Sequence, residues 1–222
     1  RKVGVGVMGL AHALMLLGLP YGSEAAEAFA RELSKSLFEA AHAESQRLAS
    51  RLGPYPAFDS GSGTPLRNAN LAAIAGTATI ALIVGTSCGI EPIHSYVTVQ
   101  RVIDREVRIM DPVVSFLLRE HGIDPAGAEG RMAMGDSLRE IAGDELADLC
   151  STALELPGSI HIRMQAALQS SIDCGITKTV NCRTETSVAE IRAWLLQAHA
   201  RGCMGLTIYR NGSLDNQPVR AA

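Results

Sequence analysis

The residues best placed for chemistry lie between two short apolar runs, Leu71 to Ala75 and Ile80 to Val84. If the second run opens a helix, the backbone N–H groups of residues 77–80 are its unpaired donors, and two Thr hydroxyls lie beside them. Such donors and the helix dipole together favour an anion. The pattern predicts either an anion site or a buried turn with Thr as N-cap, and the residues concerned are Gly76, Thr77, Ala78 and Thr79.

A second candidate for binding chemistry is a glycine motif near the start of the chain. Gly4-Val5-Gly6-Val7-Met8-Gly9 matches the G-x-G-x-x-G pattern of a dinucleotide site. That site needs a strand before the motif and, about twenty residues later, an acidic residue at the end of a second strand. Only three residues precede Gly4, and Glu24 and Glu27 lie in a helical pattern. We therefore favour a tight turn into a helix over residues 8–17, with a nicotinamide-dependent dehydrogenase as the third-ranked function.

Neither the cysteines nor the histidines have the spacing of a metal site, so we predict none. The five cysteines are odd in number and form no C-x-x-C pair. This favours reduced thiols and a cytoplasmic location over disulfides or a zinc site. The cysteines are Cys88, Cys150, Cys174, Cys182 and Cys203.

The composition excludes several classes of protein. The chain has 222 residues, a formal net charge of −3 and 47% apolar residues. It therefore lacks the basic excess of a nucleic-acid-binding surface, and its short, interrupted apolar runs predict no membrane span. We see no export signal, and the absence of an initiator Met suggests a chain that is processed, trimmed or cut from something longer. We expect a folded unit over residues 1–222 with a loose polar tail over residues 214–222.

The longest predicted element is a helix that begins after Ser23 and ends at Gly53-Pro54. Ser23 is a good N-cap, Glu24 and Glu27 favour the first turn, and Gly-Pro is a stop signal. Its length of about 28 residues corresponds to roughly 42 Å, enough to brace a sheet or barrel from outside. The apolar face that we predict comprises Phe29, Leu33, Leu37, Ala41, Leu48 and Leu52.

Shorter helices and strands alternate along the remainder. Capping signals predict helices that begin at Pro112, Ser137, Ser159 and Ser187, and residues 122–135 read as a loop. Short β-forming runs precede and separate these helices, which is the α/β pattern. Such a set of strands suits an open sheet or one half of a larger barrel; the predicted strands cover residues 71–75, 96–99, 107–109, 176–181 and 204–209.

Six stretches, in order, resemble the C-terminal part of the large catalytic chain of ribonucleotide reductases. The resemblance is greatest to the class II, adenosylcobalamin-dependent enzymes and covers nearly the whole chain. It implies an α/β fold, a ten-stranded α/β barrel of which this helix-rich chain would form most of the second half. The stretches are Gly4–Ala11, Tyr21–Ser23, Arg67–Ala69, Gly89–Pro92, Thr177–Asn181 and Gly205–Ser213.

The resemblance also implies a role for the Gly76–Thr79 turn. The family's phosphate-binding turn, usually Pro-Thr-Gly-Thr or Pro-Thr-Ala-Ser, occupies this position, so these residues would hold the substrate phosphates. Gly76 in place of Pro loosens the start of the turn. The family's radical cysteine lies in an Asn-x-Cys-x-Glu loop upstream of the matched region, and the spacing in Asn181–Glu185 is wrong for it. We therefore expect no catalytic residue on this chain, and packing roles for Cys88, Cys174 and Cys203.

These expectations together describe part of an enzyme. The resemblance implies a C-terminal subunit or fragment of an adenosylcobalamin-dependent ribonucleoside-diphosphate reductase that is inactive alone. The cofactor would be shared with, or bound mainly by, the N-terminal part. The expected partners are an N-terminal reductase chain with the radical cysteine and a ribonucleotide substrate, with neither a nucleic acid polymer nor a membrane. The alternative is a non-catalytic scaffold or regulatory protein derived from the same fold.

Overall fold

Two parallel pairs of strands, linked by a single bridge, form an interrupted sheet at the centre of the chain. The structure is a computed structural model that describes residues 1–61, 63–102 and 105–213. Strand β1 (Lys2–Val5) pairs with β2 (Asn70–Ala72), and β5 (Thr179–Cys182) pairs with β6 (Thr207–Arg210). A parallel bridge between Ile74 and Ile176 joins the two pairs. The strands therefore follow one another in the order β1-β2-β5-β6, which confirms the prediction of half a barrel.

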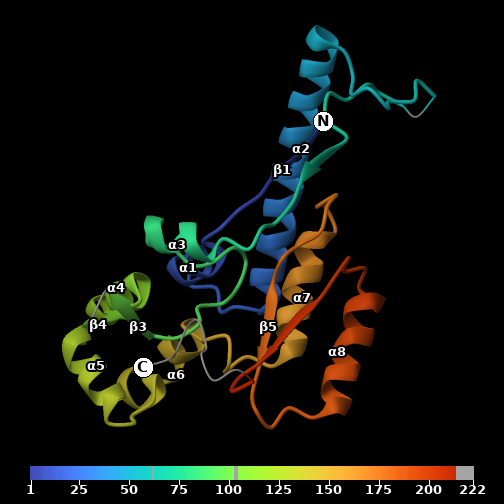
Figure 1. Cartoon of the computed structure of the whole chain (residues 1–222). Helices are drawn as coiled ribbons and strands as arrows, with labels where there is room; N and C mark the ends of the chain where they lie inside the picture. Colours follow the sequence, from blue (N-terminus) through green and yellow to red (C-terminus); the bar gives the residue numbers. More distant parts are fainter. Residues whose placement is uncertain (62, 103–104, 214–222) are drawn as a thin grey trace.

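Helices cover one face of this sheet (Figure 1). Helix α7 (Gly158–Gln169) packs against β5, α2 (Glu24–Leu52) packs against α7, and α8 (Val188–Ala200) lies on the other side of α7. On β5, Val180 and Cys182 are buried, whereas Thr179 and Asn181 are only partly so. Because side chains alternate along a strand, Thr179 and Asn181 point to the opposite face, which becomes the inner face of the half-barrel.

Helix α2 confirms the predicted length and part of the predicted apolar face, because Phe29, Leu33 and Leu37 pack against the core. It has 29 residues, and the Ser23 side chain accepts a hydrogen bond from the Ala26 amide as its N-cap. The large apolar residues predicted to face the core are only partly buried, and Leu52 is exposed. Small side chains let neighbouring backbone approach closely, so they fill the buried face instead: Ala26, Ala30, Ser34, Ser45 and Ala49.

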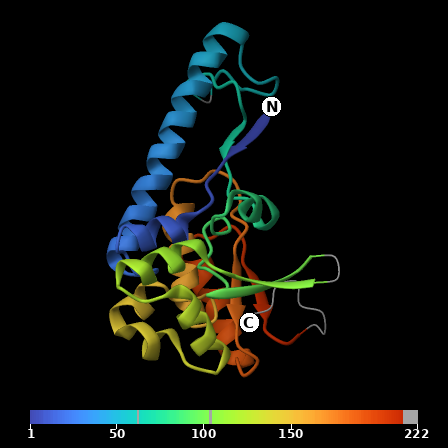
Figure 2. The same ribbon diagram turned by 90° about the vertical axis from the view of Figure 1, so that its left-hand side faces the viewer.

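A second group of elements packs beside the sheet. Strands β3 (Val97–Val102) and β4 (Arg105–Met110), which cover most of the strands predicted over residues 96–99 and 107–109, form a hairpin that extends away from the body in Figure 2. Its tip, residues 103–104, lies outside the described residues, as does the predicted polar tail, residues 214–222. Helices α4 (Pro112–Glu120) and α6 (Leu138–Leu149) are as predicted.

One predicted loop is wrong. Residues 122–135 contain helix α5 (Pro125–Ala133), which begins with Asp124 as N-cap and Pro125 at the first helical position. The Asp111-Pro112 pair that correctly predicted α4 is the same signal. The glycines at 127 and 130 weaken the helical pattern, but the cap is sufficient once α6 packs against it.

Two short helices complete the described residues. Helix α1 (Leu10–Leu16) begins after the glycine motif, two residues later than predicted, and α3 (Ala78–Val84) begins within the Gly76–Thr79 turn. In addition, β1 (Lys2–Val5) extends into the first two residues of the glycine motif, which corrects the expectation that a strand is missing there. None of the helices in the described ranges combines the length and the hydropathy needed to cross a bilayer.

Candidate functional site

The Gly76–Thr79 turn follows β2 and the bridge at Ile74, and its last two residues, Ala78 and Thr79, form the start of α3. The bridge between Ile74 and Ile176 fixes its start, because the Thr177 amide donates to the Ile74 carbonyl at 2.8 Å. A Cβ on Gly76 would lie 3.2 Å from the Thr177 methyl group, a tight contact that a larger side chain would worsen. The sequence thus brings the turn to the rim of the sheet, next to β5.

The two threonines of the turn have different environments. The Thr77 hydroxyl accepts a hydrogen bond from the Gly89 amide at 2.8 Å and does not bond to the helix that it precedes. Thr77 therefore fixes the chain on the far side of α3. Thr79 is exposed, and its hydroxyl has no hydrogen-bond partner among the described residues.

The backbone donors of the turn are open. Within the described ranges, no acceptor bonds to the amides of Ala78, Thr79 or Ile80, and these residues are exposed. The turn is therefore not the buried, internally satisfied type that sequence reasoning kept as an alternative. It presents backbone donors and one hydroxyl to the outside of the isolated chain, the arrangement that an anion requires.

A histidine braces the segment that follows α3. The Ser87 amide donates to Nδ1 of His12 at 3.1 Å, so the proton of this ring lies on Nε2, which donates to Asp111 at 2.8 Å. The other oxygen of Asp111 caps α4 by accepting the amides of Val113 and Val114. His12 and Asp111 thus fasten the chain near the turn to two helices.

The glycine motif is used for close packing within the fold and is not open to a ligand. A Cβ on Gly6 would lie 2.1 Å from the Ala73 carbonyl oxygen, and one on Gly9 would lie 2.6 Å from the Thr86 hydroxyl. The amides of Gly9 and Leu10 at the start of α1 donate to carbonyls of Ser87 and Gly89. These donors are therefore not available to a pyrophosphate, despite the strand and helix on either side of the motif.

A pocket of about 260 Å³, whose lining is more apolar than polar, opens on the inner face of the sheet beside β5, which begins two residues after Thr177. The carboxylate of Glu91 accepts the Thr179 amide at 2.6 Å and so links the segment after α3 to β5. The Tyr209 hydroxyl is buried and lacks a hydrogen-bond partner among the described residues. The pocket is lined by Glu91, His94, Thr179, Asn181, Thr207, Ile208 and Tyr209.

Behind this pocket lies a fully buried lysine. The Lys178 amino group donates to Nδ1 of His161 at 2.7 Å and to the Thr179 carbonyl at 3.2 Å. Nε2 of His161 donates to the Ala153 carbonyl at 3.0 Å. Burial lowers the pKa of Lys178 to about 7, although Glu91 opposes the shift. Burial and the nearby Lys178 lower the pKa of His161 to about 3, so this ring is neutral.

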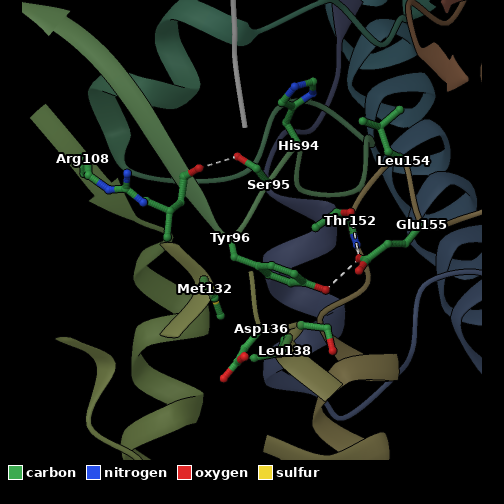
Figure 3. A pocket seen from close by; sticks show the side chains of 12 residues that line it. His94, Ser95, Tyr96, Arg108, Met132, Asp136, Leu138, Thr152, Leu154 and Glu155 are labelled. Carbon is green, nitrogen blue, oxygen red and sulfur yellow. Dashed lines mark hydrogen bonds between the residues drawn. The ribbon is translucent and has the colours of Figure 1, made fainter. Parts of the chain in front are cut away.

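A separate pocket of about 230 Å³ lies between the hairpin and α6 (Figure 3). Glu155 accepts the Tyr96 hydroxyl at 2.7 Å, together with the amide and hydroxyl of Thr152 at 2.8 Å each. Burial, reinforced by Glu155, raises the pKa of Tyr96. On the rim, Arg108 pairs with Glu129. These polar groups form hydrogen bonds and an ion pair with one another, so we assign them a structural role and not a ligand-binding one.

Cys182 occupies a packing position. It lies on the helix-facing side of β5, buried beside the core cluster that contains Val180. All five cysteines are free thiols. Within the described ranges, no three His, Cys, Asp or Glu side chains gather closely enough to hold a metal ion.

The sequence analysis did not identify the buried Lys178–His161 pair or the role of Glu91 in the neighbouring pocket. Lys178 and Glu91 entered only as letters of family-like stretches, with no role assigned to either. Lys178 lies among apolar and β-forming residues in the run Ile176–Asn181. A lysine in a strand that is expected to be buried is unusual, and this could have indicated a buried, hydrogen-bonded amine.

Comparison with known proteins identifies the family of the chain. The family model described as "Ribonucleotide reductase, barrel domain" matches residues 1–64 and 60–209. The chain is 36% identical over 228 residues to a vitamin B12-dependent ribonucleoside-diphosphate reductase of Mycobacterium tuberculosis (strain CDC 1551 / Oshkosh), with 100% of this chain and 33% of that protein covered. For the enzyme of the same name from Thermoplasma acidophilum, identity is 32% and the shares are 100% and 30%.

A solved structure supports the same assignment. The class Id ribonucleotide reductase alpha subunit of Actinobacillus ureae superposes with a TM-score of 0.81 at 25% identity, over 96% of this chain and 39% of that one. The chain thus spans about a third of the length of the curated relatives it matches. Because the family model covers almost the entire described chain, the protein belongs to the ribonucleotide reductase barrel-domain family.

Proposed function

We propose that this chain is the C-terminal portion of an adenosylcobalamin-dependent ribonucleoside-diphosphate reductase. It would supply barrel strands and the substrate-phosphate turn at Gly76, Thr77, Ala78 and Thr79, while the radical cysteine lies on an N-terminal chain or segment. The observation that carries the proposal is the open turn, whose amides at Ala78, Thr79 and Ile80 lack acceptors within the described part of the chain. Its substrate is a ribonucleotide, and residues 1–222 act as one half-barrel unit.

The exposed apolar surface and open strand edge of the chain support the proposal that it binds a large partner. Helix α3 exposes four apolar side chains, Ile80 at 51%, Leu82 at 64%, Ile83 at 78% and Val84 at 64%. Strand β1 is exposed along its entire length and forms an edge of the half-barrel. Apolar patches and open strand edges of this kind are normally covered by another part of the protein. Because the relatives are about three times as long as this chain, we propose that the remaining part of the reductase covers these surfaces.

Within that enzyme, this chain would bind and orient rather than react. The turn amides and the Thr79 hydroxyl would hold the substrate phosphates, and the Thr77–Gly89 bond and the His12 brace would keep the turn in place. We assign adenosylcobalamin, which supplies the radical chemistry, mainly to the N-terminal part.

The two alternative functions, a scaffold protein and a dehydrogenase, predict different observations. A scaffold or regulatory protein of the same fold would not restore reduction when combined with the N-terminal part. A nicotinamide-dependent dehydrogenase would need the donors at the start of α1, which the fold already uses. We place the enzyme in the cytoplasm because its five thiols are free.

Alanine substitution in the complete reductase tests the phosphate turn. Thr79→Ala removes a hydroxyl without an internal partner, so the fold should be unaffected. Loss of a charge-assisted hydrogen bond of about 1.5–3 kcal/mol should raise the substrate KM by tenfold or more. Thr64→Ala, in the exposed loop after α2, is the matched control and should leave KM unchanged. An unaltered KM in Thr79→Ala and in the double variant with Thr77→Ala would refute the proposal.

A further inference from the structure

The Asn211-Gly212 pair after β6 is a feature that the proposed function does not use. The Ser213 amide donates to the Arg210 carbonyl at 3.2 Å, which closes a β-turn at the end of the strand. Asn211 and Gly212 are the two central residues of this turn. Gly212 has φ 74°, a backbone conformation that favours glycine. The turn therefore places a residue without a side chain directly after the asparagine.

The two groups that can react within an asparagine–glycine pair are free in this turn. Among the residues that the structure describes, no acceptor bonds to the Gly212 amide and no group bonds to the Asn211 side chain. Gly212 and Ser213 are exposed and Asn211 is half-buried, so water reaches the turn. A backbone nitrogen without an acceptor thus follows a side-chain amide that no partner holds in place.

The other asparagines of the described ranges lack this combination. After Asn68, the next backbone amide donates to the Arg1 carbonyl at 3.0 Å. After Asn70, the next amide donates to the Asp173 carboxylate at 2.9 Å. Asn181 lies within β5, where it is paired in the sheet and is followed by a buried side chain. A nitrogen that is held by an acceptor must give up this hydrogen bond before it can attack, which slows its reaction.

We propose that Asn211 is a site of spontaneous covalent modification, at which the side-chain amide is converted to a carboxylate. The deprotonated Gly212 nitrogen attacks Cγ of Asn211. As the new N–Cγ bond forms, the Cγ–Nδ2 bond breaks, and the amide nitrogen takes a proton from water and leaves as ammonia. The two groups are neighbours in one chain, so the attack closes a succinimide ring without a second molecule. Water then opens either carbonyl of the ring, which gives aspartate or isoaspartate with no change of oxidation state.

The modification alters the end of the strand that carries Tyr209. The Asn211 amide donates to the Cys182 carbonyl at 2.8 Å, and the Asn211 carbonyl accepts the Thr184 hydroxyl at 3.1 Å. Opening of the ring to isoaspartate turns this carbonyl into a free carboxylate and routes the backbone through the former side chain. The bond from Thr184 and the course of the chain after residue 211 therefore change, and a negative charge is added next to Arg210.

The test follows Asn211 in the native protein at mildly alkaline pH, with the same protein in urea as the reference. Incubation in water enriched in heavy oxygen labels each new carboxylate, and digestion then takes place in ordinary water. A chymotrypsin-like protease cuts after Tyr209 and Leu214, so mass spectrometry observes Asn211 without another asparagine. An isoaspartyl methyltransferase identifies isoaspartate. We expect both products at Asn211, formed about tenfold or more faster than at Asn68 or Asn70.

Two variants separate this chemistry from a general effect on the turn. Asn211→Gln lengthens the side chain and makes ring closure much slower, so it should stop the modification. Ser213→Ala, an exposed change in the same turn that keeps both reacting groups, should leave the rate unchanged. The proposal is overturned if Asn211 remains unmodified in the native protein while it reacts in urea, because the fold would then protect the turn. Formation of aspartate alone would also overturn it, since direct hydrolysis without a ring yields no isoaspartate.

Discussion

Individual side chains near the turn bond to the segments on either side of it and leave its backbone amides free among the described residues. His12 donates to Asp111 and accepts from Ser87, and its side chain is almost fully buried. Replacing His12 by Phe keeps the ring but strands a carboxylate oxygen and an amide. We expect a loss of about 2 kcal/mol or more in the free energy of unfolding, measured with urea. His199→Phe, at the exposed end of α8, should change it little, and an equal effect of both variants would contradict the brace.

The buried pair makes stability depend on pH in two windows. The pKa of Lys178 is about 7 in the folded chain and 10.5 ordinarily, so between these values the unfolded state binds more protons and stability rises with pH. His161 is shifted from 6.5 to about 3, so stability falls as pH drops from 6.5 towards 3. Each slope is at most about 1.4 kcal/mol per pH unit. Urea unfolding from pH 7 to 10 should lose its slope in Lys178→Met; an unchanged slope would assign it to other groups.

At the scale of elements, caps were the most predictive feature of the sequence. Ser23, Ser137 and Ser187 each cap the helix predicted from them. The buried face of α2 was not predictable in this way, because small residues such as Ala30 and Ser34 become core only when α7 approaches closely. Local pattern predicted an anion site or a buried turn at Gly76–Thr79, and the amides of the turn are open; the phosphate role came from the resemblance and stays a prediction.

Helix α3 permits a prediction about assembly. Its apolar side chains are exposed in this chain, so Leu82→Lys with Ile83→Lys should cost it little stability. The same pair should weaken association with the N-terminal part, because lysines would be buried in that contact. Sedimentation of the two parts together measures this, with Val188→Lys at the exposed start of α8 as the control. Unaltered association of the α3 variant would mean that α3 faces solvent in the enzyme.

At the scale of the whole molecule, long-range contacts set the limit of sequence reasoning. The bond between Glu91 and Thr179 joins residues 88 positions apart, and that between His12 and Asp111 spans 99. No local pattern encodes such pairs, so the strand order β1-β2-β5-β6 and the pocket beside Glu91 could not be predicted from periodicity. The resemblance to ribonucleotide reductases supplied the barrel, and the structure supplied the contacts that join its segments.

Reconstitution tests the central claim most directly. The purified chain is mixed with the N-terminal part of the reductase, adenosylcobalamin, a thiol reductant and a ribonucleoside diphosphate, and deoxyribonucleotide formation is measured. We predict that neither part is active alone and that the mixture forms deoxyribonucleotide. A mixture that associates but forms no product, under conditions in which an unsplit reductase is active, would contradict the claim and favour a scaffold.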